Sequence, residues 1–201
     1  MNIFIDFLAC LAAYFLGSVS FAVLGARFFR LADPRTYGSG NPGATNVLRS
    51  GNKKAALFTL AGDVLKGVFA VLLARALGFS DVTVGLVGLA AFIGHVYPVF
   101  LKFKGGKGVA TAGGVLLTLA PFAGLAALMT WLLTVLVSRY SSLAAVAAGF
   151  SAPLWGLLFY GPQSGNTGIA LLLGATLIAR HRNNIRRLLA GTESRIGRKP
   201  K

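Results

Sequence analysis

Residues 109–138 read VATAGGVLLTLAPFAGLAALMTWLLTVLVS, an uncharged stretch that a single proline, Pro121, interrupts. A helix needs about 20 apolar residues to cross the hydrocarbon core of a bilayer. The stretch therefore fits either one long tilted helix or two short helices that turn near Pro121. The residues on both sides of it decide between these alternatives.

The composition is that of an integral membrane protein. Of 201 residues, 55% are hydrophobic and 12% are charged, which is about half the charged fraction of ~25% that soluble domains carry. No soluble domain of useful size remains outside the apolar runs, so we expect an all-α fold with residues 1–201 forming a single membrane domain. The other predicted spans cover residues 3–26, 55–77, 82–100, 143–160 and 168–179.

The basic residues set the expected topology. The net charge is +15, and Lys and Arg concentrate in cytoplasmic loops of membrane proteins. The loop 30–54, the loop 101–108 and the tail 180–201 are all basic, and Arg139 follows the stretch around Pro121. They all lie on one side only if residues 109–138 cross twice. We therefore predict about seven transmembrane helices, with two short helices flanking Pro121, the N-terminus outside and the C-terminus cytoplasmic.

The first polar motif is GSGNPGATNVLRSG, residues 38–51. Asn41 before Pro42 predicts an N-cap and a helix over residues 42–50, with backbone N–H groups beside Ser39 and Asn41 that suit an anion. Asn46 and Arg49 are three residues apart and share a face of that helix. A flexible, solvated loop is the alternative interpretation.

The second motif is GHVYPVFLKFKGGKGVAT, residues 94–111. Its loop, formed by Lys104, Gly105, Gly106, Lys107 and Gly108, precedes a helix expected near Val109, and this arrangement predicts a phosphate cradle. It is not a Walker A loop, because no Ser or Thr follows Lys107. Lysines that only anchor a membrane interface are the alternative. We interpret His95 as a structural or interfacial histidine.

The third motif is RHRNNIRRL, residues 180–188, in which His181 and Asn184 share a helical face. A basic helix end that binds anionic lipid is the alternative interpretation. In the second span, the spacing of Asp63 and Lys66 predicts a structural ion pair. Ser142 lies in the turn after Arg139, where it would line a cytoplasmic site.

Together these groups predict one cytoplasmic pocket for a phosphate-bearing ligand. The motif residues include no cluster with metal-ligand spacing, and we expect neither a metal nor another cofactor. Because the positive charge serves membrane topology, we expect no nucleic-acid partner, and no obligatory protein partner is evident.

In this order, the three motifs resemble those of the bacterial acyl-phosphate:glycerol-3-phosphate acyltransferase family (PlsY type) over essentially the whole chain. The resemblance implies a multi-pass protein of the bacterial cytoplasmic (inner) membrane with its active site facing the cytoplasm. It implies that acyl phosphate and glycerol 3-phosphate react there, beside membrane lipid, to give lysophosphatidic acid and inorganic phosphate.

The resemblance also assigns residues. It implies that Ser39, Arg49, His181 and Asn184 are catalytic and that the glycine loop binds the phosphate of glycerol 3-phosphate. Glu193 matches a structural acid of the family. We further expect Asn41, Asn46 and Ser142 among the phosphate-binding residues, and Asp63 and Lys66 in support. Lys107 is our choice over Lys104 as the main phosphate ligand.

Two other classes of function fit part of the sequence. A transporter of phosphate or organic phosphate anions would suit a basic, glycine-lined cavity, but it predicts polar groups on the outer side, where only Arg75 is expected. A lipid-binding structural protein would not need His181 and Asn184 on one face. The acyltransferase explains all three motifs.

Overall fold

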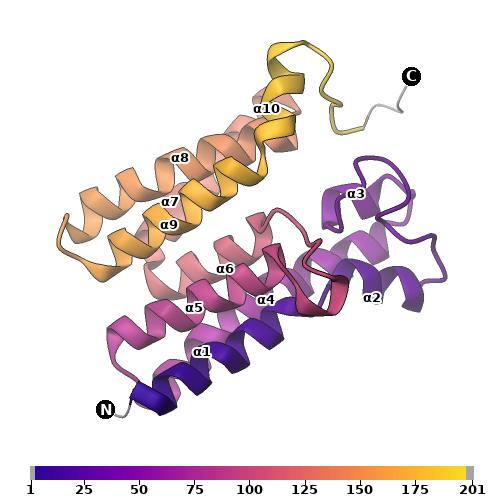
Figure 1. The fold of residues 1–201 in the computed structure, drawn as a ribbon. Coiled ribbons are helices and arrows are strands. Elements are labelled where there is room, and N and C mark those ends of the chain that lie inside the picture. The colour runs from indigo at the N-terminus through magenta and orange to yellow at the C-terminus, as the bar shows by residue number, and fades with distance from the viewer. Residues whose placement is uncertain (1–2, 198–201) are drawn as a thin grey trace. The chain divides into compact units, whose positions relative to one another are not determined.

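The computed structural model describes residues 3–197, and every regular element in that range is a helix (Figure 1). The chain forms two compact units, of which the first ends at Leu119 and the second begins at Ala120. The first contains α1 (Ile3–Ser18), α2 (Phe21–Phe28), α3 (Ala44–Leu48), α4 (Lys53–Ala76), α5 (Asp81–Val96), the 3₁₀ turn η1 (Val99–Leu101) and α6 (Val109–Leu119). The second contains α7 (Pro121–Ser138), α8 (Ser141–Tyr160), α9 (Gly165–Arg180) and α10 (Arg182–Leu189).

In the first unit, α5 packs against α1, α4 and α6, and α4 also packs against α6. Glycines bring α1 and α5 close together: a Cβ at Gly17 would collide with the Ala91 carbonyl, and one at Gly94 with the backbone at Tyr14. Small residues at helix interfaces are how membrane helices gain close backbone contact without a hydrophobic driving force. In the second unit, α8 packs against α7 and α9, and α10 packs against α8 and α9.

The short helix α3 is held against α2 and α4 by a small apolar core. Val47 of α3 is fully buried with Ala22 of α2 and Ala55 of α4, and the side chains of Phe29 and Leu31 cover them. This core anchors the first motif to the long helices, so its polar residues lie on a fixed support.

Within residues 3–197, five helical segments are long and apolar enough to cross a membrane: 3–28, 53–76, 81–101, 121–138 and 141–160. α6 with 11 residues and α9 with 16 fall short of the roughly 20 that a full crossing usually takes. Two helices flank Pro121 as expected, and Pro121 is the first residue of α7. However, α7 has 18 residues and is not short. The count of seven spans and the orientation stay predictions.

The guanidinium of Arg75 closes the end of the short helix α6. Its Nη1 donates to the carbonyl of Thr118 at 2.7 Å and its Nη2 to that of Leu119 at 3.1 Å. The last carbonyls of a helix have no partner within it, and leaving such groups unpaired inside a membrane costs several kcal/mol, roughly. Arg75, the cation predicted on the outer side, therefore has a structural role: it binds the C-terminal carbonyls of α6 in the first unit.

Candidate active site

The first motif folds around the side chain of Asn46. The Asn46 Oδ1 accepts the backbone N–H of Ser39 at 2.9 Å, and its Nδ2 donates to the carbonyls of Pro34 at 2.7 Å and Tyr37 at 3.1 Å. Asn46 itself is 2% exposed, whereas Ser39 is exposed. The amide of Asn46 thus fixes the backbone from which the Ser39 hydroxyl projects.

Two expectations for this motif need correction. The helix begins at Ala44, not Pro42, and its N-cap is Gly43 rather than Asn41, because Gly43 is fully extended and its N–H bonds to the Asn41 carbonyl. Asn46 does not present its amide to a phosphate, because backbone groups of its own loop occupy both polar atoms. It is therefore a positioning residue.

The side chain of Arg49 lies beside Gly38, the residue that precedes Ser39. Arg49 forms the C-cap of α3, and a Cβ added at Gly38 would lie 3.3 Å from its Nη1. Gly38 has a positive φ of 60°, a left-handed conformation that suits glycine. The structure thus brings the hydroxyl of Ser39 and the guanidinium of Arg49 to one exposed loop of the first unit.

The glycine loop of the second motif lies directly on α5 and enters α6 at Val109, as expected. A Cβ at Gly105 would collide with the His95 carbonyl and Pro98, and one at Gly106 with the His95 ring. Gly108 has a φ of 86°, and a Cβ there would collide with Phe92. Packing therefore requires all three glycines. Lys104, which is exposed, precedes Gly105, and the half-buried Lys107 lies between Gly106 and Gly108.

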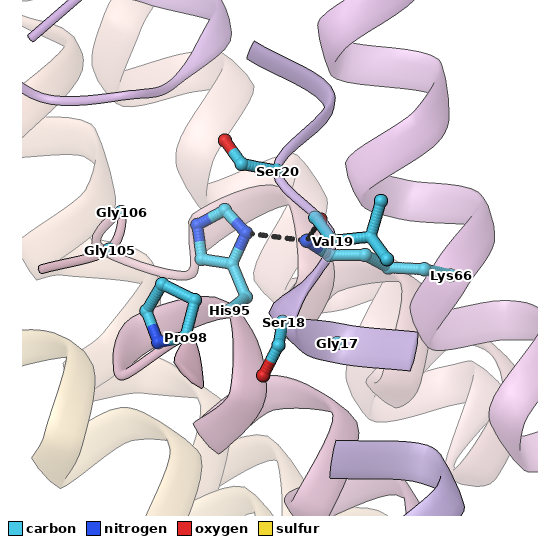
Figure 2. Close-up of a pocket in the computed structure, with 9 residues that line it drawn as sticks. All are labelled: Gly17, Ser18, Val19, Ser20, Lys66, His95, Pro98, Gly105 and Gly106. Carbon is cyan, nitrogen blue, oxygen red and sulfur yellow. Dashed lines mark hydrogen bonds between the residues drawn. The ribbon is translucent and has the colours of Figure 1, made fainter. Parts of the chain in front are cut away.

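Beneath this loop, the structure joins three ionisable side chains from α4 and α5. The Lys66 Nζ lies 2.9 Å from the Asp63 Oδ1 and 2.9 Å from the His95 Nδ1, and Lys66 and Asp63 are each 2% exposed. Figure 2 shows Lys66 and His95 in a small recess that Gly105 and Gly106 also line. The spacing of Asp63 and Lys66 predicts their ion pair, but nothing in the sequence joins His95 to it.

In the second unit, His181 ends α9 and precedes α10. Its side chain is buried, and its Nδ1 lies 2.8 Å from the carbonyl of Leu177. A carbonyl oxygen can only accept a hydrogen bond, so Nδ1 carries the proton. In the neutral ring, Nε2 then has the lone pair and is the basic nitrogen.

Glu193 connects the C-terminal segment to α8 and α10. Its Oε1 accepts from the Ser142 Oγ and the Asn184 Nδ2, both at 2.7 Å, and its Oε2 pairs with the Arg187 Nε at 2.7 Å. Burial by itself would raise the pKa of the Glu193 carboxyl, but the bonds from Asn184, Ser142 and Arg187 outweigh it and hold the pKa below its ordinary value. At neutral pH the ionised carboxylate therefore fixes the amide of Asn184 and the hydroxyl of Ser142.

The structure thus forms three local groups from the predicted residues. Ser39, Asn46 and Arg49 meet in one loop, and the glycine loop rests on the group of Asp63, Lys66 and His95. Ser142, Asn184 and Glu193 meet in the second unit. The prediction that all of them serve one pocket stays a prediction. The link between Ser142 and Glu193 was missed, because the two are 51 positions apart and no local pattern signals such a pair.

Comparison with known proteins gives consistent matches. The family model described as "Glycerol-3-phosphate acyltransferase" matches residues 7–191. A glycerol-3-phosphate acyltransferase of Dechloromonas aromatica is 61% identical over 194 residues, which are 96% of this chain and 98% of that protein. One from Burkholderia vietnamiensis is 56% identical over 96% of this chain and 92% of its own length.

Two solved structures are also similar. A crystal structure of PlsY (YgiH), an integral membrane glycerol 3-phosphate acyltransferase, in its glycerol 3-phosphate form has a TM-score of 0.89 and 41% identity, and the match covers 96% of each chain. The lysophosphatidic acid form of PlsY has a TM-score of 0.87 at the same identity, with 96% of this chain and 95% of that chain covered.

Proposed function

The chain belongs to the glycerol-3-phosphate acyltransferase family, and from this membership we propose that it transfers a fatty acyl group from acyl phosphate to the sn-1 hydroxyl of glycerol 3-phosphate. The products are lysophosphatidic acid and inorganic phosphate, in the first step of phospholipid synthesis. The strongest support is the similarity, over 96% of the chain, to PlsY in forms with glycerol 3-phosphate and with lysophosphatidic acid.

The reaction makes modest demands on the protein. The sn-1 oxygen attacks the acyl carbon, a new ester bond forms, and the bond from that carbon to the phosphate oxygen breaks with release of inorganic phosphate. Because an acyl phosphate is a mixed anhydride with a good leaving group, little acid catalysis is required. The protein has to hold two polyanions together and accept one proton, and electrostatic attraction and proximity supply the first of these.

We assign binding of the phosphates to residues of the first unit. The side chain of Arg49 lies beside Gly38, which precedes the exposed Ser39, on a loop that Asn46 holds in place. The glycine loop places Lys107 before the first turn of α6, where backbone N–H groups of a helix start favour an anion. In this assignment the glycine loop binds the phosphate of glycerol 3-phosphate.

We assign proton transfer to His181. Nδ1–H of its ring donates a hydrogen bond to the Leu177 carbonyl, so Nε2 is the nitrogen that accepts the proton of the attacking hydroxyl. Asn184 and Ser142, both fixed by Glu193, orient the substrate beside it. The phosphate of the substrate is the other candidate for the proton, and removal of the imidazole distinguishes the two.

The decisive assay uses purified protein in lipid with palmitoyl phosphate and glycerol 3-phosphate, and follows the release of inorganic phosphate and the formation of lysophosphatidic acid. We expect both products in equal amounts and only with both substrates present. Folded protein that forms neither product contradicts the proposal. Movement of radiolabelled glycerol 3-phosphate into vesicles without acyl transfer would identify a transporter instead.

The finer topology is part of the proposal: seven crossings in the bacterial inner membrane, the N-terminus outside and the active site on the cytoplasmic side. Cysteine accessibility tests it, because Cys10 is the only cysteine. In a Cys10→Ala background, Gln163→Cys and Thr192→Cys flank α9. We expect a membrane-impermeant thiol reagent to label only Gln163→Cys on intact spheroplasts. Equal labelling of both positions contradicts a crossing by α9.

A further inference from the structure

The group of Asp63, Lys66 and His95 is not explained by the phosphate contacts proposed above. Charged side chains inside a membrane domain are rare, and those that persist are paired and usually functional. Asp63 and Lys66 lie in the interior of α4, nearly inaccessible, and His95 is 7% exposed. A purely structural ion pair would need no histidine. The contacts of the His95 ring therefore indicate the function of the three-residue group.

Lys66 holds three partners at once. Its Nζ lies 2.9 Å from each of three acceptors: the carbonyl of Val19, the Nδ1 of His95 and the Oδ1 of Asp63. The contact to Asp63 is an ion pair whose angle lies outside the hydrogen-bond range. Val19 lies in the break between α1 and α2, where helical hydrogen bonding is interrupted. Lys66 thus satisfies a carbonyl that the helix break exposes.

The contact with Lys66 also sets the tautomer of His95. The same Nδ1 lies 2.9 Å from the Lys66 Nζ and 3.4 Å from the Asp63 Oδ1. An ammonium group can only donate, so opposite a charged Lys66 the Nδ1 accepts at the shorter contact and the ring carries its proton on Nε2. The ring edge with Nε2 faces the glycine loop, since a Cβ at Gly106 would collide with that atom. The backbone carbonyl of His95 also accepts the N–H of Gly106 at 3.1 Å. Ring and carbonyl of one residue therefore contact the same glycine (Figure 2).

We propose that Asp63, Lys66 and His95 act as positioning residues that fix the Gly105–Gly106 segment for binding the phosphate of glycerol 3-phosphate. Asp63 pairs with Lys66, Lys66 orients the His95 ring through Nδ1, and His95 supports Gly106 through the Nε2 edge. The inference rests on the proposed function insofar as the loop binds that phosphate. The contacts that position the loop are independent of the ligand.

The principal test is the double variant Asp63→Asn/Lys66→Met, which removes both charges together and avoids an unpaired buried ion. We expect the KM for glycerol 3-phosphate to rise by about 10- to 100-fold, the effect of displacing a binding group by ~1 Å, with a much smaller change in kcat. The KM for acyl phosphate should change less than that for glycerol 3-phosphate.

Arg75→Met is the matched control. Arg75 is also a cation of α4 that binds backbone carbonyls at a helix end, but its partners are in α6 at Thr118 and Leu119. We expect Arg75→Met to lower the melting temperature and to leave the KM for glycerol 3-phosphate unchanged. A purely structural role for the Asp63–Lys66–His95 group predicts that both variants behave alike.

Two substitutions of His95 separate its two ring nitrogens. Asparagine places its amide near the Nδ1 position and keeps a partner for Lys66, whereas glutamine places its amide near Nε2 and keeps a polar group beside Gly106. We expect His95→Asn to be the more stable variant and His95→Gln to have the KM closer to wild type. If one of the two variants were both the more stable and the closer to wild type in KM, the positioning role would be refuted.

Hydrogen–deuterium exchange gives a readout that needs no activity. In Asp63→Asn/Lys66→Met, we expect faster exchange in the peptide that contains Gly105 and Gly106, and in Arg75→Met no change there. Unchanged exchange in the double variant overturns the inference whether or not the wild type is active. A wild-type protein that makes no lysophosphatidic acid, with the expected exchange pattern, overturns the proposed function and leaves the positioning of the loop standing.

Discussion

Replacement of Glu193 should destabilise the second unit by an amount that its contacts predict. In Glu193→Ala, the buried Ser142 and Asn184 each lose a hydrogen bond to a charged acceptor. Such bonds contribute about 1.5–3 kcal/mol each, so the free energy of unfolding should fall by about 3–6 kcal/mol. The Arg187 side chain is 43% exposed, so loss of its ion pair adds only about 0–1 kcal/mol.

Two further variants make the prediction quantitative. Glu193→Gln keeps an oxygen for Ser142 and Asn184 but makes both bonds neutral, and charge-assisted bonds are roughly twice as strong. We therefore expect a loss of about 1–3 kcal/mol. Arg187→Gln should lie within about 1 kcal/mol of wild type. Unfolding in mixed micelles, with acyl transfer measured on the same samples, should give the order Arg187→Gln, Glu193→Gln, Glu193→Ala.

The pH dependence of the free energy of unfolding tests whether ionised Glu193 stabilises the fold. The folded-state pKa of Glu193 is lowered from its ordinary value of 4.5. A carboxyl of this kind stabilises the fold at pH values above 4.5, and that stability is lost as the pH falls through the lower folded-state pKa. The gap in stability between wild type and Glu193→Gln should therefore narrow below pH 4.5. A Glu193→Ala variant as stable as wild type, or a gap that widens in acid, would refute the reasoning.

Three other substitutions test single contacts. His181→Ala should lower kcat by about 10²- to 10⁴-fold, the usual contribution of a general base, in initial-rate assays; near-wild-type kcat would assign the proton to the substrate phosphate. Asn46→Leu removes three hydrogen bonds to the loop backbone, at Pro34, Tyr37 and Ser39, so we expect lower kcat and faster tryptic cleavage within residues 30–54; a loop as resistant as wild type would contradict this role. Gly106→Ala would collide with the His95 ring and should raise the KM for glycerol 3-phosphate; an unchanged KM would show that the loop tolerates displacement.

The sequence predicts the features that depend on local chemistry. Pro121 starts a new helix because its ring cannot continue the preceding one, and Asp63 and Lys66 pair because three positions bring side chains to one face of a helix. The break between α1 and α2 was not predicted, because residues 3–26 are a mostly apolar run in which only Asp6 is charged. What accommodates the break is Lys66, 47 positions after Val19, and no local pattern contains that information.

Contacts that no local sequence pattern contains also explain the errors in the first motif. Asn41 before Pro42 is a good helix start by propensity, yet the helix begins two residues later than Pro42. The buried amide of Asn46 binds the carbonyls of Pro34 and Tyr37, and this contact shapes the preceding loop. A side chain that is predicted to bind a ligand and one that organises its own loop have the same residue type and spacing. Only the identity of its hydrogen-bond partners distinguishes them.

The two histidines of the chain show why the partner matters more than the residue type. The Leu177 carbonyl accepts a hydrogen bond from Nδ1–H of His181, so Nε2 of that ring is the basic nitrogen. In His95, by contrast, the Lys66 ammonium donates to Nδ1, so Nε2 carries the proton and is a donor. A ring of the second kind already carries its proton on Nε2, so it cannot accept the proton of an attacking hydroxyl at that nitrogen. A proton added at Nδ1 instead would displace the hydrogen bond from Lys66 and place a second positive charge 2.9 Å from its ammonium group. His95 is thus unsuited to be the base, and His181 has the tautomer that the proposed reaction requires.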